Sequence, residues 1–234
     1  MLVPDDEKWA HPPSVWGPVE DQLAGGRPAW FPFGTAVLSE WQIAQLEPPV
    51  FDDLPTRATA FDRLGRTGDR SRTLVHSYVA DSKIRRLAAV PHRYIASFEN
   101  AWGVTSPDFS IATDMPTHRR VDAVWWNRAL GAFYQSRGIR VIPHVRWCDS
   151  RDYEYCFLGV KPGSAVAVSN HGCWRDGMLR HGFLHGMQAM IERLEPSTLF
   201  LYGTMDHAHL RRLARRTTIV HMEVERTLAR KGAR

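Results

Sequence analysis

The feature that most constrains this 234-residue chain is a regular alternation of strand and helix patterns from Thr73 onward. Short apolar runs predict six strands, over residues 73–79, 102–106, 140–147, 164–170, 198–202 and 217–222. Apolar spacing typical of a helix face predicts helices over residues 81–90, 118–137, 179–194, 207–216 and 223–230. Strands that alternate with helices form parallel βαβ units with right-handed crossovers. The pattern therefore predicts an α/β fold.

Six strands, with a further candidate at residues 35–38, are enough for a compact or incomplete (β/α) barrel-like fold, which we expect. An open, doubly wound sheet is the alternative. No glycine-rich phosphate fingerprint follows the first strand, which disfavours a dinucleotide-binding fold.

The first part of the chain lacks this periodicity. Residues 1–35 are rich in Pro, Gly and Trp and predict an irregular arm, whereas residues 36–234 are expected to form a single α/β domain of catalytic type. Residues 55–72 are polar, contain two glycines and predict a surface loop.

Composition excludes several classes of protein. With 44% hydrophobic residues and 9 Trp, the chain is too apolar and aromatic to be disordered. It has no apolar run of about 18 residues, so no membrane span is expected. The acidic start, Met1 to Lys8, does not resemble a secretory signal, and three cysteines without CxxC pairing favour a reducing cytoplasm. The oligomeric state is left open.

The formal net charge of +5 conceals an asymmetry. Residues 1–60 carry 9 acidic and 3 basic residues, and the remainder carries 27 basic and 16 acidic residues. An arginine-rich body favours a nucleic-acid partner, with DNA favoured over RNA, although arginines that merely solvate helices would give the same count. The predicted phosphate contacts include a C-terminal basic cluster, Arg211, Arg212, Arg215 and Arg216.

Active sites of parallel α/β folds lie at the carboxyl ends of the strands. The second predicted strand ends at Ser106 and Asp108, and Asp114 follows shortly after. A pair of carboxylates there can supply a nucleophile or general base and a partner that holds a proton. Capping of turns or of the next helix is the structural alternative for both aspartates.

The third and later strands supply further candidates. His144 and Arg146 alternate with Val145 and therefore share one face of their strand, which is either the inner face or the outer face beneath a helix. We expect His144 to be catalytic, and Ser106, Arg146, Trp147, Ser169 and Tyr202 to contact substrate. Although the chain has 11 histidines, it has no metal-binding motif, and neither a metal nor a cofactor is predicted.

Several segments resemble an uncharacterised bacterial and phage family, Domain of Unknown Function 4417. They are SPDFS (106–110), DMP (114–116), WWNRALGAFYQSRGI (125–139), VIPHVRW (141–147), YCFLGV (155–160) and SAVAVSNHGC (164–173). The resemblance implies a phage, mobile-element or host-defence setting, and carries Asp108, Asp114, Arg128, Trp147 and Ser169 over as site residues. The family usually has VIPTVSW where this chain has His144 and Arg146. A small parallel barrel with strand-end aspartates is also similar to transglycosylases that exchange bases in tRNA or DNA, an analogy of fold alone.

These observations favour an enzyme acting on nucleic acid, a DNA N-glycosylase or base transglycosylase that uses strand-end carboxylates. One alternative is a metal-dependent nuclease or phosphodiesterase built from His144, His171, Asp206 and His221. The other is a non-catalytic accessory protein that binds nucleic acid.

Overall fold

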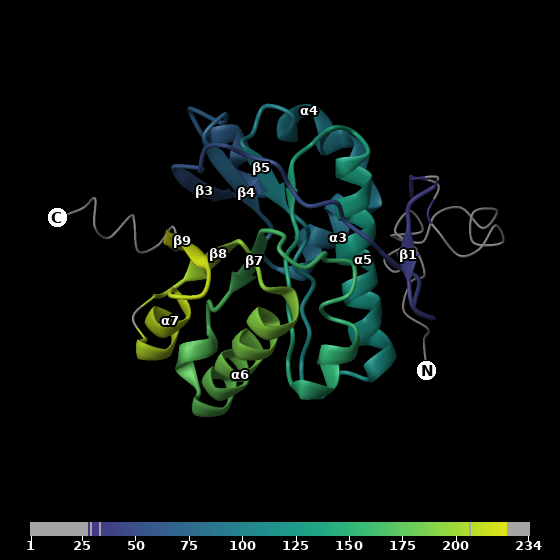
Figure 1. Ribbon diagram of the computed structural model, residues 1–234. Coiled ribbons are helices and arrows are strands. Elements are labelled where there is room, and N and C mark those ends of the chain that lie inside the picture. The colour runs from purple at the N-terminus through teal and green to yellow at the C-terminus, as the bar shows by residue number, and fades with distance from the viewer. Residues whose placement is uncertain (1–27, 29, 33, 206, 224–234) are drawn as a thin grey trace, which may run out of the picture.

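The structure, a computed structural model, describes residues 28, 30–32, 34–205 and 207–223 (Figure 1). Most of the predicted arm, Asp206 and the predicted terminal helix beyond Glu223 lie outside the described residues. The candidate strand at residues 35–38 contains β1 (Val37–Leu38), which pairs antiparallel with β2 (Ile43–Ala44). This hairpin is separate from the parallel sheets.

In the part of the chain that the structure describes, seven parallel strands make up two sheets. The first sheet has the order β3-β4-β5-β6, formed by Arg57–Ala60, Thr73–His76, Gly103–Thr105 and Val141–Ile142. The second has the order β7-β8-β9, formed by Val166–Ser169, Thr198–Gly203 and Thr218–Glu223.

The prediction of a surface loop over residues 55–72 is wrong in its first half. Arg57–Ala60 is strand β3, and a 3-10 helix follows over Phe61–Arg66. Arg57 is exposed and only Ala60 is buried, so this edge strand carries almost no apolar pattern. It pairs with β4 through hydrogen bonds between backbone groups, which do not depend on the side chains and so cannot be recognised in the sequence.

A single parallel bridge between His144 and Ala167 connects the two sheets. The Val145 amide donates to the Ala167 carbonyl at 2.9 Å, and the Ala167 amide donates to the Pro143 carbonyl at 2.8 Å. The strand predicted over 140–147 is reduced to β6 and this bridge, because Pro143 has no N–H to continue the ladder.

The described strands follow one another in space in the order of the sequence, with no reversal of the kind that a doubly wound sheet requires. β3 and β9 approach each other, but no ladder pairs them within the described residues. The α/β class with parallel sheets is confirmed, and a closed barrel is not seen.

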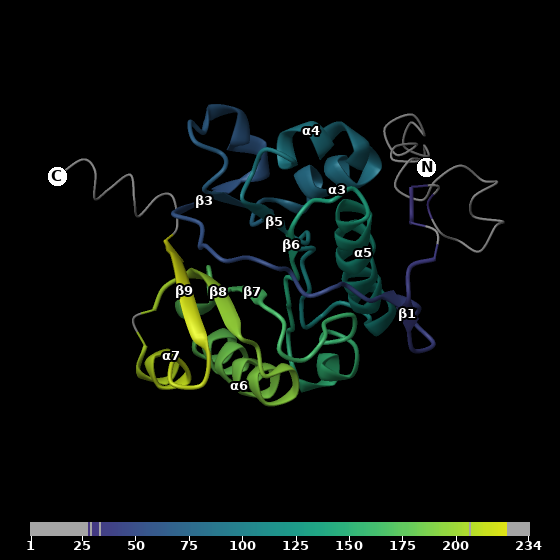
Figure 2. The ribbon, with the colours of Figure 1, turned by 45° about the horizontal axis from the view of Figure 1, so that its top comes forward.

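The helices cover the outer faces of the sheets. Figure 2 places α6 and α7 beneath β7, β8 and β9, and α3, α4 and α5 around the other sheet. Their bounds are Asp81–Ala89 for α3, Ile95–Phe98 for α4, Thr117–Gln135 for α5, Gly177–Leu194 for α6 and Ala208–Leu213 for α7. The two long helices begin within two residues of their predicted positions and end within two residues of them.

Alternate residues of each strand belong to two different hydrophobic clusters. In β8, Leu199 and Leu201 join the large cluster that includes helix residues, whereas Phe200 and Tyr202 join a smaller one. The smaller cluster collects Leu74, Trp102, Ile142, Ala165, Ala167, Phe200, Tyr202 and Met222, which come from both sheets. The two sheets therefore share an interior between them.

The segment between β2 and β3 covers the amino ends of the strands. Phe51 packs against Trp102, which precedes β5, and against Phe200. Arg140, which precedes β6, donates to the Val50 carbonyl at 3.0 Å and lies over the Trp102 ring. Because this segment covers the amino ends of the strands, a site that is open to ligands lies more readily at their carboxyl ends.

Candidate functional site at the carboxyl ends of the strands

Three side chains from the ends of β5 and β6 form a buried charged cluster. One Asp108 oxygen, Oδ1, lies 2.9 Å from His144 Nε2, and Arg146 Nη1 lies 3.0 Å from Oδ1 and 2.9 Å from Oδ2. Asp108 is 7% exposed and His144 2%, whereas the side chain of Arg146 is 37% exposed. His144 and Arg146 therefore share one face of their segment, and both contact Asp108.

The electrostatics of the cluster keep Asp108 ionised. Burial by itself would raise the pKa of the carboxyl group, but the charges of Arg146 and His144, with their hydrogen bonds, hold the pKa well below its usual value. The Asp108 charge in turn raises the pKa of Arg146. An ionised carboxylate only accepts hydrogen bonds, so Nε2 of His144 carries the proton that faces Asp108.

The second imidazole nitrogen of His144 meets residues that follow β4. Nδ1 lies 3.3 Å from the Tyr78 hydroxyl, and Tyr78 stacks on Tyr202 with ring centroids 4.6 Å apart. His76 stacks on Tyr78 and lies against Tyr202 in a tilted arrangement. Burial lowers the pKa of His76 to about 3, so this histidine is neutral. The Ser77 hydroxyl accepts a hydrogen bond of 2.7 Å from the Asp108 amide. The end of β4 therefore belongs to the same cluster.

A buried polar framework beneath the cluster sets the backbone of His144. Arg128, 1% exposed, donates from Nη1 to the His144 carbonyl at 2.7 Å, and from Nη2 and Nε to the carbonyls of Cys156 and Leu158, each at 2.9 Å. The Ser106 hydroxyl accepts a hydrogen bond of 2.7 Å from the His144 amide and donates one of 2.8 Å to Asn127 Oδ1. Arg128 also donates to Asn127.

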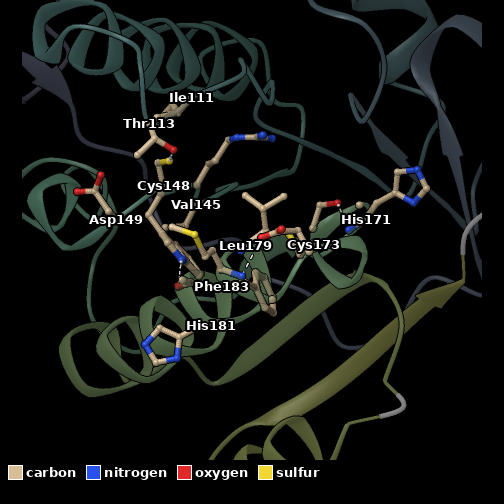
Figure 3. Close-up of a pocket in the computed structure, with 18 of the residues that line it drawn as sticks. Ile111, Thr113, Val145, Cys148, Asp149, His171, Cys173, Leu179, His181 and Phe183 are labelled. Atoms are coloured by element: carbon tan, nitrogen blue, oxygen red, sulfur yellow. Dashed lines mark hydrogen bonds between the residues drawn. The ribbon is translucent and has the colours of Figure 1, made fainter.

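A cavity of about 860 Å³ opens beside this cluster (Figure 3). Four of the predicted site residues line it, namely His144, Arg146, Trp147 and Ser169. Thr113, Cys148, Asp149, His171, Cys173 and His181 add polar groups, and Ile111, Val145, Met178, Leu179 and Phe183 add apolar ones. Its size falls within the range of about 300–1,000 Å³ that holds small-molecule ligands.

Trp147 forms part of the cavity wall and is held on helix α6. Its indole Nε1 donates to the Gly182 carbonyl at 3.1 Å, and its ring stacks on Phe183. A Cβ at Gly186 would lie only 2.0 Å from Nε1. Gly182 and Gly186, one turn apart, therefore leave the space on α6 that the indole occupies.

The remaining predicted residues occupy other positions. Ser106 and Arg128 lie in the buried framework, and Tyr202 lies in the aromatic stack. Asp108 lines a separate void of about 10 Å³, which has room for roughly one water molecule. Asp114 is exposed in the turn before α5 and lines neither space.

The basic cluster Arg211, Arg212, Arg215 and Arg216 is exposed on and after α7. Because α7 leads from the carboxyl end of β8 to the amino end of β9, Arg215 and Arg216 lie toward the covered end of the strands. None of the four arginines lines the cavity at the strand ends.

The sequence reasoning missed His76, Ser77 and Tyr78. They lie at the end of the first predicted strand, residues 73–79, whereas the predicted site residues follow the second and later strands. The same rule applied to the first strand would have found all three residues. Their sequence offers no other signal, because only the fold brings Tyr78 to His144, 66 residues away, and Ser77 to Asp108, 31 residues away.

No group of three or more potential metal ligands gathers anywhere in the described part of the chain. Of the residues named for the metal-dependent alternative, His144 is engaged by Asp108 and Tyr78, His221 contacts the Gly203 carbonyl, and Asp206 lies outside the described residues. Among the described helices none has the length and apolar character needed to cross a membrane.

The fold and the site define an α/β protein with parallel sheets and a charged cavity at the carboxyl ends of its strands. The chain belongs to the family described as Domain of unknown function (DUF4417), which matches residues 36–222. This finding confirms the resemblance given by the sequence motifs.

Two phage proteins are among its relatives. The Gene 1 protein of Mycobacterium phage L5 is 28% identical over 169 residues, 72% of this chain and 74% of the relative. The Gene 1 protein of Mycobacterium phage D29 is 28% identical over 167 residues, 71% of this chain and 62% of the relative. The chain thus spans less than two thirds of the D29 protein. No solved structure matches the chain.

Proposed function

We propose that this chain is an enzyme of phage biology that acts on nucleic acid and cleaves or exchanges an N-glycosidic bond in DNA. One observation carries the proposal: the buried Asp108 carboxylate is held ionised by His144 and Arg146, and these two partners line an open cavity at the strand ends. An accessory protein that only binds nucleic acid has no need of such a cluster.

The reaction requires a charge partner and a proton carrier. When the bond between C1′ and the base nitrogen breaks, its electron pair leaves with the base and positive charge develops on the sugar. Water then gives its oxygen to C1′ and its proton to a base, while the departing nucleobase takes up a proton. In an exchange reaction, a nitrogen of the incoming base takes the place of water.

His144 is suited to carry the proton. Nδ1 is the nitrogen able to accept one, since Nε2 faces Asp108, and the Tyr78 hydroxyl lies on the path to it. Asp108 stabilises the imidazolium that forms. Because donors cover both of its oxygens, Asp108 acts in this proposal as the charge partner of His144 and Arg146 and does not attack the sugar.

The cavity offers binding for a single nucleotide taken out of the stack. Arg146 uses only Nη1 for Asp108, and its other donors have no partner within the described ranges, so the exposed part of its guanidinium can hold a phosphate. Trp147 and Phe183 supply a flat apolar wall for a base.

We further propose that the two sheets form an incomplete (β/α) barrel. The sequential strand order, the bridge at His144 and the interior cluster shared by both sheets support this arrangement.

The test is release of free base, measured by mass spectrometry after incubation with plain and modified DNA and RNA. Asp108→Asn and His144→Gln should each lower release by at least about 100-fold. Glu154→Gln, a change of an exposed carboxylate outside the cavity, is the matched control and should leave release unchanged.

Absence of base release from every substrate contradicts the proposal, and so does full activity of Asp108→Asn. Strand cleavage that chelator abolishes would favour the phosphodiesterase alternative. Binding that Asp108→Asn leaves unchanged, without any reaction, would favour the accessory protein.

A further inference from the structure

The rim of the cavity exposes two large apolar side chains next to each other. Met178 is 84% exposed and Leu179 52%, and both line the cavity. Figure 3 shows Leu179 close to Cys173 and Phe183 at the cavity. The other large apolar residues exposed in the described part of the chain are Val50 and Leu54, in the segment that covers the opposite end of the strands.

The two residues at the rim are held in a defined place. They lie in the first turn of α6, where the Asp176 side chain accepts hydrogen bonds from the Met178 amide at 2.8 Å and from the Leu179 amide at 3.0 Å. A capped first turn presents side chains from a fixed backbone. Exposed apolar groups on a fixed backbone indicate a surface that something else covers.

The charges around Met178 and Leu179 indicate what covers them. Arg175 and Arg180 flank the pair and are exposed, and neither guanidinium has a carboxylate partner among the residues that the structure describes. Two arginines without carboxylate partners, one before and one after an apolar protrusion in the sequence, can pair with backbone phosphates around a base step. Asp176, the one carboxylate between them, is engaged by the helix amides.

We propose that Met178 and Leu179 form a wedge that enters a DNA duplex at the mouth of the cavity, while Arg175 and Arg180 hold the flanking phosphates. Apolar side chains of this kind insert between base steps and unstack them. The inserted pair would fill the gap left by a nucleotide that enters the cavity. This inference rests on the proposed function, since it names the form in which that site takes its substrate.

The experiment uses a DNA duplex with 2-aminopurine at its centre, whose fluorescence rises when the base leaves the stack. Met178→Ala/Leu179→Ala should bind the duplex but lose the fluorescence rise that the wild-type chain produces. Arg175→Ala/Arg180→Ala should bind more weakly, with a slope of log affinity against log salt that is smaller by about 2, or about 1 per arginine.

Val50→Ala/Leu54→Ala is the matched control, because this pair is 83% and 43% exposed at the opposite end of the strands. It should behave like the wild-type chain in both measurements. Since all four apolar side chains are exposed, their truncation leaves the fold intact, which circular dichroism checks.

An unchanged fluorescence rise in Met178→Ala/Leu179→Ala overturns the wedge, as does failure of the wild-type chain to bind the duplex at low salt. Binding to lipid vesicles, or a dimer that this double substitution disperses in sedimentation, would assign the surface to a membrane or to a second copy and also overturns it. A fluorescence rise that needs the wedge, without base release from any substrate, supports the wedge and rejects the proposed reaction. Base release that is unchanged in Met178→Ala/Leu179→Ala supports the proposed reaction and rejects the wedge.

Discussion

The tight contact between Trp147 and helix α6 should make Gly186 intolerant of any larger side chain. In Gly186→Ala, the new Cβ would lie 2.0, 2.2 and 2.4 Å from three indole atoms of Trp147. These separations are far shorter than any contact between nonbonded heavy atoms. The indole cannot simply tilt away, because Nε1 donates to the Gly182 carbonyl and the ring stacks on Phe183. Trp147 must therefore leave its position.

Three contributions determine how Gly186→Ala changes the free energy of unfolding. Overpacking of a filled site costs about 1–3 kcal/mol, and loss of the indole hydrogen bond about 1 kcal/mol more. Alanine in place of glycine inside a helix returns about 1 kcal/mol. Gly186→Ala should therefore lower the free energy of unfolding by about 1–3 kcal/mol, measured by urea denaturation followed by circular dichroism.

Gly182→Ala is the control on the same face of α6. Its Cβ would meet the Cys148 carbonyl oxygen at 3.2 Å, a contact that a shift of a few tenths of an ångström relieves. The helix gain should then offset the strain, and stability should stay within about 1 kcal/mol of the wild-type value. If Gly186→Ala proves as stable as Gly182→Ala, Trp147 is not held in this position and the reasoning fails.

Three further predictions concern buried polar groups. Asp108→Asn should lower the free energy of unfolding by about 3–5 kcal/mol near pH 7. Because the folded-state pKa lies below 3.8, the ionised carboxylate stabilises the fold above about pH 4 and loses this effect on further acidification; a gap to the wild type that stays constant down to pH 3 would contradict it. His76 has its pKa lowered to about 3, so only the unfolded state takes up its proton between about pH 3 and 6.5. Stability should then be about 2 kcal/mol lower at pH 5 than at pH 8 because of this group, and His76→Phe should flatten that part of the profile; identical profiles would refute this. Arg128→Met should cost about 3–5 kcal/mol in urea denaturation, because three backbone carbonyls lose their donor, whereas Arg119→Met on the exposed face of α5 should cost less than about 0.5 kcal/mol; equal costs would show that the buried contacts contribute nothing.

Much of the fold could be predicted where local pattern and tertiary environment agree. Helix α6 buries one apolar face, and β8 is an apolar run buried on both sides, so their positions follow from the local pattern of apolar residues. Strand β3 could not be found in this way, since its edge position exposes Arg57 and removes the pattern. The strand at 140–147 was predicted too long because Pro143 lies within it.

The candidate site was predictable in part for a related reason. The rule of strand carboxyl ends led to Asp108, His144 and Arg146, and these three do lie together. The same rule could not separate Asp108 from Asp114, because one turn of chain decides which carboxylate faces the interior and which faces solvent. It also could not tell that Arg128 binds backbone carbonyls.

The sequence by itself determined the alternation of strands and helices, the parallel α/β class and the family to which the chain belongs, since these depend on local spacing and short motifs. Only the tertiary structure decided that Tyr78 meets His144, that Trp147 lies against two glycines of α6, and that Met178 and Leu179 stand exposed beside the cavity. Such contacts join residues distant along the chain, and their energies depend on burial and on distances of a few ångströms. Local sequence patterns specify neither the burial of a side chain nor its distance from residues far along the chain.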